Sequence, residues 1–467
     1  MVSAAEQLAS QMNLSVFAKA EDLKKRIWFT LGALLVYRLG TFIPIPGINP
    51  AAVAQNFSQS KAGILGQLNM FAGGAVERMA IFALNIMPYI SASIIIQLMT
   101  SVVPQLEALK KEGEAGRKQI NQYTRFLTVA LATAQAFGIA INLQGQTSSV
   151  GPVVLQPGPF FVASTVVTLV GGTMFLMWLG EQITQRGIGN GTSLIIFAGI
   201  VAGMPVAIAG LFEMSRTQAI SPGLLIGLLA LMVVVVAAIV FIERAQRRLL
   251  IQYPKRQTGT MLAKGESSHL PLKLNSSGVI PPIFASSLLL LPATIAQFAS
   301  GSQGQGWVNT YLPPSVANWI PDWSTIAAAL GPGQFWHMAI YVGLILFFAF
   351  FYTAVVFNPV ETADNLRKYN GFLPGIRPGA KTAEYIDYVL TRITVIGALY
   401  LAAVCVLPEI LISQAAVPFY FGGTSLLIAV SVTMDTVSQL QSHLLAHQYQ
   451  GLIKKSKLRG SGPGGRR

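Results

Sequence analysis

Ten apolar stretches of about 20 residues decide what this chain can fold into, because a helix of that length crosses the hydrocarbon core of a bilayer. They lie near residues 27–43, 78–103, 124–143, 159–180, 188–211, 222–242, 278–298, 335–357, 388–411 and 418–440. Of the 467 residues, 52% are hydrophobic and only 11% are charged, which is more apolar than a soluble fold of this size. The sequence therefore predicts an all-α polytopic membrane protein with ten transmembrane helices.

Basic residues are distributed unevenly over the connections, and this predicts the orientation of the chain. All but four of the 32 Lys and Arg residues precede the first stretch, follow the last or lie in alternate connections; the exceptions are Arg38, Lys61, Arg78 and Arg216. Because cytoplasmic connections collect Lys and Arg, we expect both termini and the basic loops in the cytoplasm. The residues before position 20 show no small-residue cleavage pattern, so we expect the first stretch to be a retained span.

A similar pattern of proline and serine occurs twice and divides the chain into halves. Residues 86–96 read IMPYISASIII, and residues 280–290 read IPPIFASSLLL. Each pattern belongs to the second of five spans, and five spans per half make the halves inverted repeats, which place a working site at their interface. We expect a polar segment at 1–23, a first half at 24–221, a second half at 222–440 and a basic tail at 441–467, disordered after Gln450.

The second stretch is interrupted, unlike an ordinary lipid-facing helix. Pro88 lies within it and predicts a kink near mid-span, because proline removes a backbone hydrogen bond and clashes with the preceding turn. Gly73 and Gly74 predict a backbone hinge upstream, which joins a short apolar segment to the span. A broken helix with such an appendage indicates a lined cavity rather than a plain anchor.

Side chains that could carry catalysis or hold a metal are scarce. His443 and His447 have the i, i+4 spacing of metal ligands, but no third ligand accompanies them. The single cysteine, Cys405, allows no intramolecular disulfide. We find no nucleophile with a base and no phosphate-binding loop, so we expect no enzyme, cofactor or metal. An inverted-repeat secondary transporter stays open as an alternative, although ion coupling requires buried charges and the candidate cavity helices are nearly charge free.

Aliphatic side chains stand where a transporter would carry charges. Ile86 and Ile90 are one turn apart in the second stretch, Ile196 lies in the fifth, and Ile283 begins the seventh. A ring of them would oppose ion passage by dewetting, although ordinary helix packing would explain the same spacing. The connections 243–276 and 358–387 are long and basic, which suits anionic lipid headgroups or a large acidic partner such as ribosomal RNA.

Seven longer motifs follow one another over nearly the whole chain. They are RLGTFIPIPGI (38–48), NMFAGGA (69–75), IMPYISASIIIQL (86–98), KKEGEAGRKQINQYTR (110–125), GTMFLMWLGEQITQRGIGNG (172–191), FNPVETADNLRKYNGFLPGIRPG (357–379) and PFYFGGTSLLI (418–428). In these motifs the chain resembles the SecY family, the central channel subunits of bacterial protein translocases. The resemblance implies a central pore in the bacterial inner membrane that translocates unfolded, signal-bearing polypeptides and releases apolar segments laterally into lipid.

The resemblance also implies roles for particular residues. A pore ring would comprise Ile86, Ile90, Thr192, Ile196, Ile283 and Ile428. A plug at about 64–74 would include Leu68, Asn69, Met70, Phe71, Gly73 and Gly74, and a lateral gate between the second and seventh spans would include Ser91, Ser286 and Ser287. Docking of the ribosome and the SecA motor would involve Arg247, Arg248, Lys255, Arg256 and Arg377.

Thr192 departs from the aliphatic pattern of the implied ring. Its hydroxyl would either weaken the dryness of the ring or bond back to its own helix without effect. The partners implied by the resemblance are the small membrane subunits SecE and SecG, SecA, the ribosome, secretory and membrane proteins with signal sequences, and anionic lipids.

Overall fold

Each of the ten predicted spans falls on a helix of the computed structural model. The structure describes residues 21–59, 64–148, 151–218, 220–253, 257–258, 261–262, 267–289, 334–415 and 423–459. The span helices are α3 (Glu21–Gly40), α6 (Met87–Val102), α8 (Glu114–Gln144), α9 (Pro159–Arg186), α10 (Gly191–Arg216), α11 (Pro222–Arg244), Ile280–Leu289, α16 (Phe335–Val356), α18 (Ala380–Ala415) and α19 (Gly423–Arg459). Six described helices are long and apolar enough to cross a membrane, or seven if a bent pair counts as one span.

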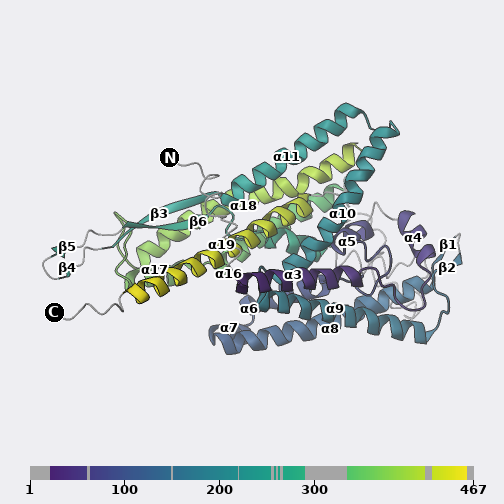
Figure 1. The fold of residues 1–467 in the computed structure, drawn as a ribbon, viewed down its shortest axis with the longest axis horizontal. Coiled ribbons are helices and arrows are strands. Elements are labelled where there is room, and N and C mark those ends of the chain that lie inside the picture. The colour runs from purple at the N-terminus through teal and green to yellow at the C-terminus, as the bar shows by residue number, and fades with distance from the viewer. Residues whose placement is uncertain are drawn as a thin grey trace.

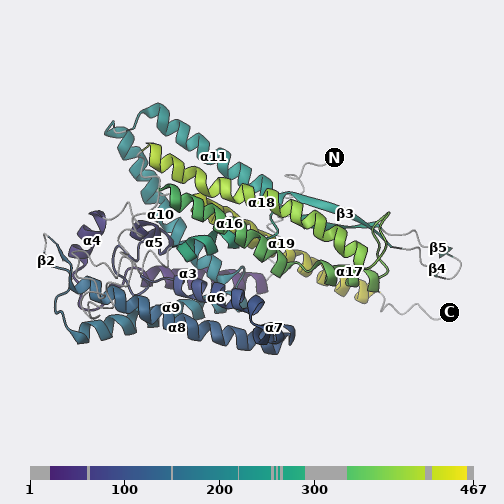
Figure 2. The same ribbon diagram turned by 180° about the vertical axis from the view of Figure 1, so that it is seen from behind.

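The two halves of the chain lie side by side. Figures 1 and 2 show α3, α6, α8 and α9 of the first half together, and α11, α16, α18 and α19 of the second half together beside them. Helix α10 joins the halves, because it packs against α3 and α9 on one side and against α11 and α19 on the other. A site at the interface is therefore built around α10.

Shorter elements mark the two ends of the bundle. They are α4 (Pro50–Gln59), α5 (Ile64–Phe71), α7 (Pro104–Lys111), α17 (Pro359–Lys368), β1 (Thr147–Ser148), β2 (Gly151–Pro152), β3 (Gln246–Gln252), β4 (Gln257–Thr258), β5 (Met261–Leu262) and β6 (Ser267–Lys273). We call the end that carries α7, α17 and the strands β3 and β6 the basic end, and the end that carries α4, β1 and β2 the far end (Figure 1).

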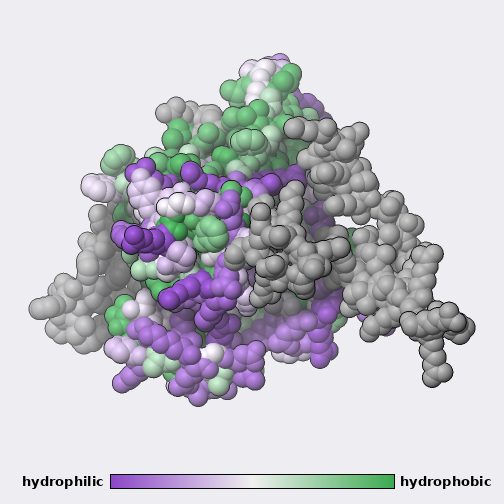
Figure 3. Space-filling view, turned by 90° about the vertical axis from the view of Figure 1, so that its left-hand side faces the viewer, coloured by the Kyte–Doolittle hydropathy of each residue, from purple (hydrophilic) through white to green (hydrophobic). Residues whose placement is uncertain are grey.

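At the basic end, the two long basic connections form one unit. Strands β3 and β6 pair antiparallel from Gln246↔Lys273 to Gln252↔Ser267. Gln252 and Phe372 exchange both backbone hydrogen bonds, at 2.9 and 3.0 Å, which ties this hairpin to the connection before α18. Figure 3, which looks at this end, shows a predominantly hydrophilic face below a hydrophobic upper edge.

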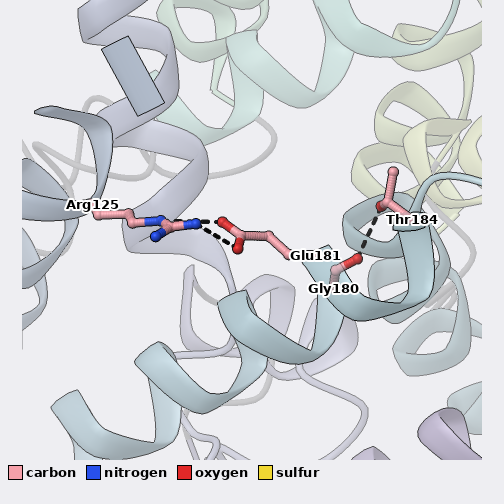
Figure 4. Close-up of polar contacts among 4 residues, drawn as sticks. All are labelled: Arg125, Gly180, Glu181 and Thr184. Atoms are coloured by element: carbon pink, nitrogen blue, oxygen red, sulfur yellow. Dashed lines mark hydrogen bonds and ion pairs between the residues drawn. The ribbon is translucent and has the colours of Figure 1, made fainter. Parts of the chain in front are cut away.

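The turn between α9 and α10 is tight because two glycines meet in it. A Cβ built on Gly191 would lie only 1.9 Å from the carbonyl oxygen of Gly180. The Thr184 hydroxyl donates to that carbonyl at 2.9 Å and accepts from the Gly191 N–H at 2.9 Å. Beside this turn, Arg125 of α8 forms a forked ion pair with Glu181, the shorter contact being 2.6 Å (Figure 4). These contacts fix where α10 enters the bundle.

The structure corrects the prediction of a mid-span kink at Pro88. Helix α6 begins only at Met87, and residues 72–86 form a series of turns, so Pro88 stands in the first turn of the helix. Proline is tolerated there because the N–H it lacks would have no partner within the helix. The bend lies at the other end, where α6 and α7 meet at 97° before Pro104. At the predicted hinge the backbone forms a left-handed turn, with φ of 62° at Gly73 and 86° at Gly74.

The prediction of disorder after Gln450 is wrong as far as Arg459. Helix α19 continues from the tenth span to Arg459, well beyond the expected end of the span at residue 440. The tail up to that point contains no proline, and its Leu, Lys, Gln and Arg residues are good helix formers, so nothing stops the helix at the membrane surface.

Candidate functional site

The predicted ring isoleucines lie in one apolar cluster at the interface of the halves. Ile86, Ile90, Ile196 and Ile428 are each at most 7% exposed and belong to this cluster, and Ile283 packs against it, partly buried. They come from the start of α6, from α10, from the helix Ile280–Leu289 and from α19, so each half contributes two elements. The cluster consists chiefly of aliphatic and aromatic side chains, which offer an ion no favourable contact.

Thr192, the one polar member of the predicted ring, is partly buried. It is the second residue of α10, and its hydroxyl donates to the side chain of Asn190 at 2.7 Å. Asn190 caps the helix, because its side chain also accepts from the Thr192 N–H at 3.2 Å. The hydroxyl is therefore satisfied by the cap of its own helix, and Thr192 stands one helical turn before Ile196 on the side of the basic end.

The predicted plug includes the short helix α5 and contacts the same cluster. Phe71, the last residue of α5, is 5% exposed and belongs to the cluster, while Met70 packs against it. Leu68 instead packs against a smaller apolar group with Phe57 and Ala72. The plug segment thus lies against the isoleucine cluster on the side of the far end.

The plug backbone touches α10 where that helix has a glycine. A Cβ built on Gly199 would lie 2.4 Å from the carbonyl oxygen of Phe71, and one on Gly73 would lie 3.0 Å from the Gly199 Cα. The same Cβ on Gly199 would lie 3.0 Å from the hydroxyl oxygen of Tyr37, a residue of α3 that is 1% exposed. Only a glycine at position 199 allows this approach of two backbones.

Two polar side chains hold carbonyl oxygens of the plug segment. Asn85, which is 2% exposed, donates from Nδ2 to the Phe71 carbonyl at 2.7 Å. Arg38 donates from Nη1 to the Gly73 carbonyl at 2.6 Å. Within the segment, Asn69 accepts from the Glu77 N–H at 2.9 Å and so folds the hinge back onto α5. The seat of the plug is therefore polar as well as apolar.

A cavity of about 590 Å³ lies on the far-end side of the plug. One wall is the plug segment with Asn69 and Met70, and the other is the second half of α10 with Met204, Leu211 and Met214. The charged side chains in its lining are Arg38, Glu77, Arg78 and Glu213. The cavity reaches the apolar cluster along α10, because Ile200 and Leu211 belong to both.

The predicted gate helices touch one another directly. Ser287 lies 3.8 Å from the Met87 sulfur, through its hydroxyl, and this contact joins α6 to the helix Ile280–Leu289. Ser287 is 3% exposed and Ser91 is 6% exposed, so both lie inside the bundle. Ser286 donates back to the Ile283 carbonyl at 3.0 Å. Of the three predicted seam serines, Ser287 is the one that contacts the opposite helix through its hydroxyl.

The predicted docking arginines are exposed at the basic end. Arg247 and Arg248 lie on β3, and Arg377 lies in the connection that pairs with the hairpin through Phe372. Lys255 and Arg256 lie outside the described residues. Among the residues that the structure describes, no group of three His, Cys, Asp or Glu side chains could hold a metal ion.

Sequence reasoning missed four residues of the plug seat: Tyr37, Arg38, Asn85 and Gly199. Two of them carried a readable signal. Asn85 is an amide in an apolar stretch, and a polar residue at membrane depth is a functional candidate by default. Gly199 interrupts an apolar helix, which marks a possible close approach of backbones. Tyr37 and Arg38 gave no such signal, because only the fold brings them to the plug.

Comparison with known proteins identifies relatives over nearly the whole chain. The family model named SecY matches residues 80–437. The chain is 54% identical over 439 residues to the protein translocase subunit SecY of Rickettsia conorii, covering 94% of this chain and 97% of that protein. It is 52% identical over 441 residues to the SecY subunit of Escherichia coli K12, covering 94% and 96%.

Solved structures share the fold at low sequence identity. A protein-conducting channel matches with a TM-score of 0.61 at 17% identity, and a SecY structure described for its plug domain matches with 0.63 at 18%. Each comparison covers 90% of this chain and 92% of the other. The Sec61 channel of a canine ribosome complex matches with 0.57 at 17% identity.

Proposed function

The chain belongs to the SecY family of protein translocase subunits and is a channel subunit rather than an enzyme; we propose that its isoleucine cluster and its α5 plug together seal the resting pore. Its fold class is that of the family, with ten transmembrane helices in two inverted five-helix halves around a central pore. The channel translocates unfolded, signal-bearing polypeptides and releases apolar segments into lipid. The alternative of a secondary transporter has no support from its relatives.

An apolar seal suits a channel whose substrates have no common sequence. Specific hydrogen bonds would recognise some side chains and reject others, whereas aliphatic side chains yield to any chain that passes. In the absence of substrate the same side chains exclude water and so oppose ions. The burial of Ile86, Ile90, Ile196 and Ile428 at the interface of the halves is the observation that carries this proposal.

The plug adds a second barrier on the far-end side of the ring. Its contacts with Asn85, Arg38 and Gly199 keep α5 against the cluster. A similar solved structure is described by the statement that the SecY plug domain stabilises the closed state of the channel and maintains a membrane seal. We transfer that role to residues 64–74 of this chain.

The lateral gate lies between α6 and the helix Ile280–Leu289, at the contact between Met87 and Ser287. This contact joins the halves 24–221 and 222–440 by one weak sulfur bond and apolar packing. A signal with an apolar core of about 7–15 residues must reach lipid from the pore. Separation of α6 from the helix Ile280–Leu289 would let the apolar core of the signal pass from the pore into lipid.

The basic end faces the cytoplasm, together with both termini and the tail 441–467. The connections 243–276 and 358–387 form the docking surface there, with Arg247, Arg248 and Arg377 exposed on it. A similar channel, Sec61, has been solved in a ribosome complex, which supports the ribosome as a partner. The other proposed partners are SecA, SecE, SecG and anionic lipids. The proposed location of the channel is the bacterial inner membrane.

The test is the ion conductance of the resting channel in a planar bilayer. Replacing Ile86, Ile90 and Ile196 together by serine introduces hydroxyls into the ring, so we expect a steady leak in the absence of any signal. Ile139→Ser is the matched control, because Ile139 is a buried isoleucine of α8 that belongs to a different cluster. A triple variant that conducts no more than this control would contradict the proposed seal.

A further inference from the structure

Arg38 reaches from the end of α3 to the hinge of the plug. Its Nη1 donates to the Gly73 carbonyl at 2.6 Å, across 35 residues of sequence, and contacts the Thr41 hydroxyl at 3.5 Å. Gly73 presents this carbonyl because its backbone is left-handed, with φ of 62°. A hydrogen bond from a guanidinium to a carbonyl is stronger than one between neutral groups. Arg38 is therefore placed to restrain the point about which the plug would swing.

A second arginine converges on the same place. The Cζ of Arg38 lies 4.7 Å from the centre of the Phe42 ring, and the Cζ of Arg78 lies 4.2 Å from it. Arg78 follows the hinge in sequence, so the arginine that holds the Gly73 carbonyl and an arginine just downstream of the hinge meet at one aromatic ring. Phe42 is 50% exposed and buries little, so its role here is that of a platform for the two cations.

Two positive charges at one ring repel each other, and this makes the arrangement easy to release. The ring attracts each guanidinium, but within the part of the chain that the structure describes no ion pair of Arg38 or Arg78 offsets this repulsion. A restraint of this kind holds the plug while the hinge is closed and loses both contacts together once the hinge moves. It is suited to a segment that must leave its seat without a large penalty.

We propose that Arg38, stacked on Phe42, is the latch of the plug, and that it sets how strong a signal must be to open the channel. This inference rests on the proposed plug. A signal opens the channel by binding the open state better than the closed one, and it can shift the equilibrium only by that difference. A latch that stabilises the closed state therefore raises the differential affinity that a signal must supply, and so rejects weak signals.

The test replaces Arg38 by methionine, which keeps an unbranched stem and removes the guanidinium. Loss of a charged hydrogen bond is expected to raise the open fraction of the resting channel roughly ten- to hundredfold. The expected readouts are a matching rise in resting conductance and export of a precursor whose signal has a shortened apolar core. Arg38→Lys keeps the charge but not the planar stack, so its resting conductance should lie between that of the unaltered channel and that of Arg38→Met.

Arg216→Met is the matched control, because Arg216 is an exposed arginine at the far end of α10. The proposal is overturned if Arg38→Met conducts no more than this control and still rejects the weakened precursor. If the Arg38→Met protein does not accumulate, Phe42→Leu tests the same proposal. Because Phe42 is half exposed, this variant should fold, and it should leak; a tight Phe42→Leu channel would also overturn the latch.

The Ile86, Ile90 and Ile196 serine variant is measured in parallel to separate this inference from the proposed function. If that variant leaks while Arg38→Met and Phe42→Leu stay tight, the seal stands and the latch is refuted. If all of them stay tight, both the seal and the latch are refuted.

Discussion

Gly199→Ala should open the resting channel, because position 199 is where the plug backbone rests on α10. The added Cβ would lie 2.4 Å from the Phe71 carbonyl oxygen, whereas ordinary contact begins at 3.4 Å. The two atoms must therefore separate by about 1 Å, and both are held by backbone rather than by a flexible side chain. The new Cβ cannot move toward Tyr37 instead, since the Tyr37 hydroxyl oxygen would lie only 3.0 Å from it.

The strain against Phe71 falls on the closed state alone, since that contact is lost once the plug leaves. Overpacking of this kind costs about 1–3 kcal/mol. That shifts the ratio of closed to open channels by roughly five- to 150-fold. The assay is the conductance of the purified channel in a planar bilayer without substrate, where the open fraction is read from the current.

Gly203→Ala is the control that isolates this contact. Gly203 lies one turn further along α10, and a Cβ there meets nothing within 4 Å. Both variants gain helix propensity, about 1 kcal/mol for each glycine replaced, so that effect cancels in the comparison. If Gly199→Ala and Gly203→Ala conduct equally little, the plug does not rest on α10 as argued. Deleting residues 64–71 should abolish the difference between the two variants, because the contact is then gone from both.

Two further predictions concern the gate and the docking surface. Cysteines in place of Met87 and Ser287 should form a disulfide in the resting channel, because those side chains meet at 3.8 Å, and a bound signal peptide should lower the yield of that disulfide; an unchanged yield would argue against parting of this seam. Arg377→Glu should reduce motor-driven export several-fold while insertion and resting conductance stay normal, since the residue is exposed at the basic end; export at the normal rate would refute its docking role.

The helices could be predicted from the sequence because their signal is local. Each span is a long apolar stretch, and the distribution of Lys and Arg needs no knowledge of contacts. The start of α6 escaped the same reasoning. Residues 79–86 are as apolar as a span, but the left-handed backbone at Met79 and Asn85 keeps them from joining the helix. Hydropathy cannot distinguish such turns from helix, so Pro88 looked internal although it begins the helix.

In the site, too, some residues could be predicted from the sequence and others could not. The ring isoleucines and the plug were expected from the resemblance to a family, and the structure brings the isoleucines together with Phe71 of the plug in one cluster. The seat of the plug was not expected, because it depends on contacts between positions far apart in the chain. Arg38 meets Gly73 and Gly199 meets Phe71 only after α3 and α10 have packed. The spacing of residues along the sequence does not predict these two contacts.

The plug shares the apolar packing of the ring through Phe71 and is held besides by a few polar contacts, which explains how one channel can be both tight and easily opened. Asn85 and Arg38 donate to main-chain carbonyls of the plug segment, and Gly199 approaches its backbone. Few bonds therefore have to break, each with a net value of about 1–3 kcal/mol. Moving an apolar signal core from water into lipid releases about 0.8 kcal/mol for each buried CH₂ group. A core of several leucines therefore supplies enough free energy to unseat the plug, whereas a core interrupted by charge does not.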